Sequence, residues 1–160
     1  MNEYFGDLMA MTERQQWRAR DAAWWLALTK KRRGEMAEAA FLHKASMLGF
    51  GVSKPWGDSE PYDLIVDSGS GLWRVQVKSA YRCNENGGFA ICAHGSRRKK
   101  SYSPKEIDVL VAYIVPEDLW YVLPVTLFRK TKSLTLFPKP SSPSKYNVNR
   151  EAWRLLGGKP

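Results

Sequence analysis

The hydrophobic positions in the first third of the chain follow a helical period. Trp17, Trp24 and Leu28 recur at helical spacing, which predicts a helix over residues 12–29. A second helix is predicted over residues 33–48, because apolar side chains recur along one side of it and a glycine follows as a stop signal. Four basic residues, 30–33, lie where the second helix begins, and one continuous helix is the alternative interpretation.

The middle of the chain instead has the short alternating runs that are typical of β-strands. A Ser-Gly-Ser-Gly turn at residues 68–71 joins two of these runs into a predicted hairpin, and residues 116–118 join another two. Loops are expected at 82–106 and 138–144, and a short closing helix at 149–156. The predicted strands are 50–54, 62–67, 72–79, 89–93, 107–115 and 119–123.

This order of elements predicts an α/β (α+β) fold, with a mixed central β-sheet flanked by helices. A chain of 160 residues can form one domain with an added helix or arm. We therefore expect an N-terminal helical extension at residues 1–29 and one main domain at residues 30–160.

Composition adds a strong positive charge to this picture. The formal net charge is +9 and the sequence pI is about 9.7. A polyanion is the favoured partner, because each lysine or arginine placed near a phosphate releases a condensed counterion. The alternative is a basic surface that only keeps the protein soluble. The two basic clusters that we expect to contact a DNA backbone are Lys30, Lys31, Arg32 and Arg33, and Arg97, Arg98, Lys99 and Lys100.

The two cysteines form neither a zinc-type spacing nor a disulfide framework. The N-terminal region lacks the pattern of a signal peptide, and no apolar run approaches the roughly 20 residues that span a bilayer. We therefore expect a cytoplasmic, nucleoid-associated protein without a membrane partner.

Chemistry concentrates on one face of the predicted hairpin at residues 62–79. Side chains alternate along a strand, so Arg74, Gln76 and Lys78 share one face while the valines between them share the other. Asp63 belongs to the polar face of the neighbouring strand. The alternative interpretation is an edge hairpin with one solvated face.

The residue types on this face suit phosphodiester hydrolysis, which needs a divalent cation to neutralise the phosphate and activate water. Mg²⁺ prefers oxygen ligands, and Mn²⁺ accepts the same donors. Asp63 offers a carboxylate, Gln76 an amide oxygen and Val77 a backbone carbonyl. Lys78 could orient hydroxide or stabilise charge that develops on phosphorus. Glu35, on the helix before these strands, could complete the site through a water.

Gly34-Glu35, Tyr62-Asp63 and Gln76-Val77-Lys78 resemble the motifs of the PD-(D/E)XK nuclease superfamily. Within it, the chain is most similar to bacterial group I intron homing endonucleases, which carry Gln-x-Lys in place of Asp/Glu-x-Lys. The resemblance covers about residues 30–156. Its later parts are Tyr102, Ile107-Asp108, Tyr121-Val122-Leu123-Pro124, Tyr146 and Ala152-Trp153.

The resemblance implies a restriction-endonuclease-like core and a metal-dependent, site-specific endonuclease that acts on double-stranded DNA. It assigns catalysis to Glu35, Asp63, Gln76 and Lys78. It also implies a homodimer or homotetramer, and cutting two strands is most simply done by two symmetry-related sites. The stripe of Trp17, Trp24 and Leu28 is the candidate interface, with packing on its own core as the alternative.

The sequence leaves several alternatives open. Glu38 lies three residues after Glu35, about 60° around the helix, and rivals it. His43 and His94 are isolated and have no predicted role. The alternative functions are a Holliday-junction-resolvase-like nuclease and a non-catalytic DNA-binding protein that keeps the nuclease fold. An RNA-binding protein is disfavoured, because the paired aromatic strand motifs of such modules are missing from the sequence.

Overall fold

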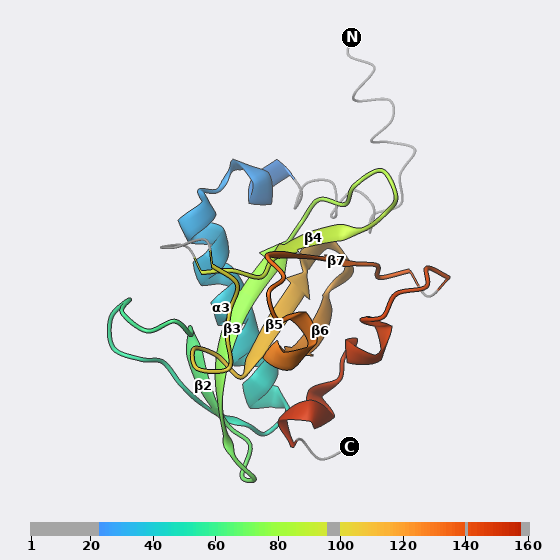
Figure 1. The fold of residues 1–160 in the computed structure, drawn as a ribbon. Coiled ribbons are helices and arrows are strands. Elements are labelled where there is room, and N and C mark those ends of the chain that lie inside the picture. Colours follow the sequence, from blue (N-terminus) through green and yellow to red (C-terminus); the bar gives the residue numbers. More distant parts are fainter. Residues whose placement is uncertain (1–22, 96–99, 140, 158–160) are drawn as a thin grey trace.

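A computed structural model describes residues 23–95, 100–139 and 141–157. Its centre is a five-stranded mixed sheet with strand order β1-β2-β3-β5-β6. Helix α3 covers one face, while the small sheet of β4 and β7 lies over the other face (Figure 1). The predicted α+β fold with a mixed central sheet is therefore confirmed. The predicted domain boundary at residues 29 and 30 stays a prediction.

Helix α3, Lys30–Met47, begins three residues before the predicted start. Thr29 explains the difference, because its side chain accepts a hydrogen bond from the Arg32 backbone N–H at 3.2 Å and so caps the helix. The preceding residues 23–27 are helical but separate from α3, so the continuous helix is excluded there. Residue 12 and Trp17 lie outside the described residues.

Strands β1 (Gly51–Ser53), β2 (Leu64–Asp67) and β3 (Leu72–Ala80) form an antiparallel unit, with β2 in the middle. The predicted turn between β2 and β3 is confirmed. The Ser68 N–H donates to the Gly71 carbonyl at 3.0 Å, and Gly69 adopts a φ of 77°. This positive φ favours glycine at that position.

Strand β5 (Val109–Ile114) lies parallel to β3 and antiparallel to β6 (Leu119–Pro124). The predicted second hairpin is therefore confirmed, and its turn is the short 3₁₀ helix Val115–Glu117. The parallel pairing leaves β3 in the centre of the sheet, with β2 on one side and β5 on the other.

Strands β4 (Phe89–Cys92) and β7 (Ser133–Leu136) form the separate two-stranded sheet. The sequence predicted β4 but not β7, which has only four residues. The remaining elements are 3₁₀ helices, so the predicted helix at 149–156 is wrong in type and in its start. The 3₁₀ helices are Val125–Phe128, Asn147–Asn149 and Trp153–Leu156.

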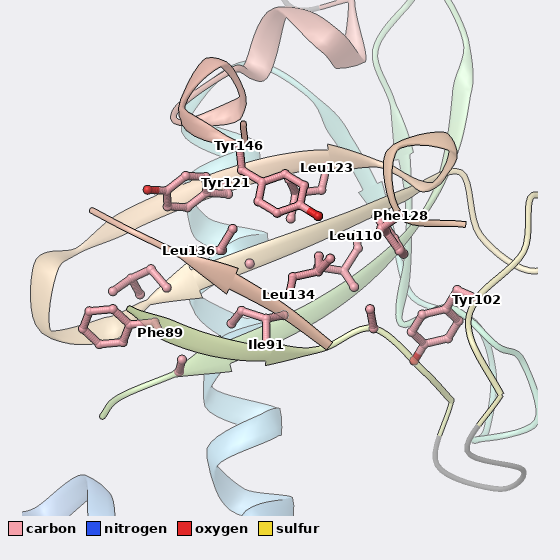
Figure 2. Close-up of a cluster of buried hydrophobic side chains, with 14 of the residues drawn as sticks. Phe89, Ile91, Tyr102, Leu110, Tyr121, Leu123, Phe128, Leu134, Leu136 and Tyr146 are labelled. Carbon is pink, nitrogen blue, oxygen red and sulfur yellow. The ribbon is translucent and has the colours of Figure 1, made fainter. Parts of the chain in front are cut away.

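Two hydrophobic clusters hold the layers together. One joins α3 to the sheet, and Val75 and Val77 of β3 belong to it, together with Phe41 of α3. The other joins the opposite sheet face to β4 and β7, with Ile91, Leu134 and further side chains in Figure 2. The predicted apolar face of β3 is therefore the face that α3 covers.

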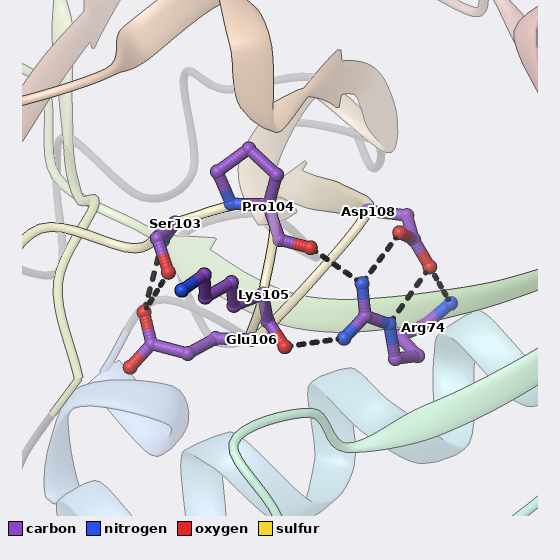
Figure 3. A network of polar contacts seen from close by, with 6 residues as sticks. All are labelled: Arg74, Ser103, Pro104, Lys105, Glu106 and Asp108. Atoms are coloured by element: carbon purple, nitrogen blue, oxygen red, sulfur yellow. Dashed lines mark hydrogen bonds and ion pairs between the residues drawn. The ribbon is translucent and has the colours of Figure 1, made fainter.

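Arg74 has a structural role at the start of β3 (Figure 3). Its guanidinium binds both carboxylate oxygens of Asp108, at 3.1 and 2.8 Å. It also donates to the carbonyls of Pro104 and Lys105. Hydrogen bonds from the Arg74 guanidinium lower the pKa of the Asp108 carboxyl, because they stabilise its charged form. These contacts attach the loop before β5 to β3.

None of the helices in the described part of the chain is both long and apolar enough to cross a membrane.

Candidate active site

The site lies where β3 loses its partner on one side. Strand β2 pairs with β3 only as far as Val75, whereas β5 continues along the other side to Ala80. The Asp63 N–H still donates to the Val75 carbonyl at 2.9 Å, and the chain then turns away. Among the described residues, no strand pairs with the second half of β3 on this side, which we call the free edge, and its backbone groups need other partners there.

Asp63 supplies one of these partners. Its Oδ2 accepts a hydrogen bond from the Val77 N–H at 2.8 Å and another from the Gln76 side-chain amide. Burial raises the pKa of the Asp63 carboxyl, while the Val77 N–H opposes this shift and the charge of Glu38 adds to it. The partly buried carboxylate is thus fixed at the free edge of β3.

Gln76 and Val77 bring two further oxygens to the same place. The Gln76 side chain is buried, with 7% of the residue exposed. Its Nε2 faces Asp63 Oδ2 and lies 3.4 Å from the Val77 carbonyl oxygen. The N–H and C=O of one strand residue point the same way, so the Val77 carbonyl also faces this edge.

Lys78 lies one step further along the same face. Its ammonium is 6.0 Å from the centre of the Tyr102 ring. Both residues line a cleft of about 760 Å³, together with Asp63 and Gln76. Three of the residues that the sequence singled out, Asp63, Gln76 and Lys78, therefore line one cleft, whereas Val77 lines the neighbouring cavity.

Two acids of α3 face this cleft, and their surroundings differ. Glu35 and Glu38 both line it. The Glu35 side chain is 45% exposed and lies 3.5 Å from Arg32. The Glu38 side chain is only 22% exposed, and its charge acts directly on Asp63. Glu38 also lines a neighbouring cavity of about 400 Å³ with Asp63 and Gln76.

The predicted basic residues divide into four groups. Lys30, Lys31 and Lys100 line the large cleft, while Arg33 lines the neighbouring cavity. Arg32 is paired with Glu35 at the start of α3. Arg97, Arg98 and Lys99 lie outside the described residues.

The donors at the free edge fit a hard divalent cation. Within the described ranges, no group of three or more His, Cys, Asp and Glu side chains could hold a metal ion. The available set is instead mixed: the Asp63 carboxylate, the Gln76 amide oxygen, the Val77 carbonyl and a carboxylate from α3. Oxygen donors of these kinds suit Mg²⁺ with several retained waters.

The sequence missed two residues of the cleft. Tyr102 was noted only as part of the family resemblance, and its ring packs beside Lys78. Lys54 carried no functional signal, because the sequence placed it at the end of the predicted strand 50–54, whereas β1 ends at Ser53 and Lys54 lies in the connection that follows. Neither His43 nor His94 is among the described residues that line the cleft.

Comparisons with known proteins identify the family and the fold. The family model for PD-(D/E)XK endonucleases matches residues 28–156. The solved structure of a bacterial homing endonuclease, I-Ssp6803I, is similar over 80% of this chain and 91% of that chain. The TM-score is 0.68 at 31% sequence identity. No curated protein matches the chain.

Proposed function

The chain belongs to the PD-(D/E)XK endonuclease family, whose members are DNA-cleaving hydrolases that generally use divalent metal ions. From this premise we propose that it cleaves double-stranded DNA at specific sites, with Mg²⁺ or Mn²⁺ bound at the free edge of β3. The observation that carries the proposal is the meeting of Asp63, Gln76 and Lys78 in one cleft.

The residues at this edge divide into metal ligands and a residue that acts on water or phosphate. Asp63, Gln76 and the Val77 carbonyl would hold the cation, which would supply charge neutralisation at the scissile phosphate and a lowered pKa for water. Gln76 must first rotate its amide, because Nε2 and not the oxygen now faces Asp63. Lys78 orients the attacking water or stabilises negative charge on the phosphate. Glu35 or Glu38 adds the carboxylate from α3.

Basic side chains support DNA as the substrate. Lys30 and Lys31 from the first turn of α3 and Lys100 from the connection between β4 and β5 line the cleft that holds the acids. Lysines at such positions attract the phosphate backbone without reading sequence. A binding role for Arg32, Arg33, Arg97, Arg98 and Lys99 belongs to the same proposal.

We further propose a homodimer or homotetramer on DNA. One cleft of this size can cleave one DNA strand at a time, and a symmetric pair of clefts could cleave both strands. Trp24 supports an interface before α3, because 55% of this large side chain is exposed while the adjacent Trp25 is buried.

Four single substitutions test the assignment of the site. We expect Asp63→Asn and Lys78→Met each to lower the cleavage rate by about a hundredfold or more, with DNA binding retained. Glu35→Gln and Glu38→Gln, compared side by side, identify the α3 acid by the larger loss. Cleavage would be followed on linear and four-way-junction DNA, with Lys139→Met as a distant surface control. Full activity of Lys78→Met would contradict the assignment.

A further inference from the structure

The Glu38 carboxylate forms an ion pair with a lysine side chain of the same chain. Lys54 lies in the connection between β1 and β2, and its ammonium is 2.7 Å from Glu38 Oε2. The two residues are 16 positions apart in sequence. The pair therefore joins the loop that forms one wall of the cleft to the helix that forms another wall.

Lys54 lies among carboxylates. The Glu38 carboxylate raises the pKa of the Lys54 ammonium, and the charges of Asp63 and Asp58 raise it further. Lys54, Glu38 and Asp63 all line the same cleft. The ammonium thus lies in the negative potential of the carboxylates at this edge.

We propose that Lys54 competes with the divalent ion for Glu38, and so sets the metal concentration at which the site fills. This inference rests on the proposed function. While Lys54 holds Glu38, that carboxylate is a weaker ligand for a metal ion, because its charge is already compensated. Binding of the cation requires the ammonium to withdraw from Glu38.

The strength of the pair is compatible with such an exchange. The Lys54 side chain is 60% exposed, and partly exposed ion pairs are weak because water screens them. A divalent ion carries twice the charge and can displace the ammonium. The freed Lys54 remains on the cleft wall, where a DNA phosphate offers it a new partner.

Direct measurement of Mn²⁺ binding to the full chain without DNA tests this inference. Electron paramagnetic resonance counts free Mn²⁺ and needs no cleavage. We expect Lys54→Met to lower the dissociation constant for Mn²⁺ about three- to tenfold, because a weak competing pair is removed. Lys54→Arg keeps the cation and should bind Mn²⁺ as the parent does. Lys139→Met makes the same charge change on a distant exposed residue and should have no effect.

A second comparison tests the route through Glu38. In a Glu38→Gln background, Lys54→Met should no longer tighten Mn²⁺ binding. The inference is overturned if Lys54→Met binds Mn²⁺ as weakly as the parent or more weakly, if the tightening persists without Glu38, or if no variant binds Mn²⁺. Loss of cleavage in Asp63→Asn is measured separately, so failure of the competition and failure of the proposed function are distinguishable.

Discussion

Gln76 occupies the position that is Asp or Glu in the PD-(D/E)XK motif. An amide oxygen can bind Mg²⁺ but brings no charge, so the site has one negative charge fewer than an acidic version. Hard divalent ions are bound mainly by carboxylate charge. The same lack of charge reduces repulsion of the scissile phosphate.

Substitutions at Gln76 test whether its side-chain oxygen binds the metal ion or whether the side chain only fills space. We expect Gln76→Glu to tighten metal binding and keep some cleavage, since it restores a charged oxygen. Gln76→Leu keeps the volume but has no oxygen, and we expect it to lose most activity. A magnesium titration of the cleavage rate makes the comparison. If Gln76→Leu matches the parent at every magnesium concentration, the Gln76 side chain is not a ligand.

At the scale of elements, the free edge of β3 depends on how β3 is held at its other end. Arg74 and Asp108 join β3 to the start of β5 through two side-chain contacts, and Asp108 also accepts from the Arg74 backbone N–H at 2.8 Å. Both side chains are about 30% exposed. This network fixes the parallel pairing that leaves Gln76 and Lys78 at the cleft.

Asp108→Asn should therefore lower the free energy of unfolding by about 1–3 kcal/mol near neutral pH. The Asp108 pKa is lower in the folded chain, so its contribution is full above the ordinary aspartate value of about 3.9 and is lost as the pH falls through the lower folded value. Urea unfolding at several pH values measures this. We expect the difference between parent and Asp108→Asn to shrink at acid pH, and a difference that grows there would contradict this role.

The elements also explain what the sequence could predict. The period of two in β3 placed the valines on one face and Gln76 and Lys78 on the other, because a buried face leaves little freedom of register. The sequence did not reveal β7, since four alternating residues resemble many loops. It also could not reveal the pair of Lys54 and Glu38, because that contact depends on how an irregular loop folds over α3.

At the scale of the whole molecule, the cleft combines opposite charges in one place. Lysines from α3, from the β1–β2 connection and from β3 line it together with Glu35, Glu38 and Asp63. The acids suit a metal ion, and the lysines suit a phosphate backbone. The net charge of +9 adds a long-range attraction for DNA. A metal-dependent endonuclease needs both properties.

The most direct test of this account is restoration of DNA cleavage by metal after chelation. Double-stranded DNA of randomised sequence is incubated with the full chain, first in excess chelator and then with Mg²⁺ or Mn²⁺ added beyond the chelator. We predict no cleavage in chelator and recovery of cleavage with either ion, while Asp63→Asn stays inactive in all conditions. Undiminished cleavage in excess chelator would contradict the account.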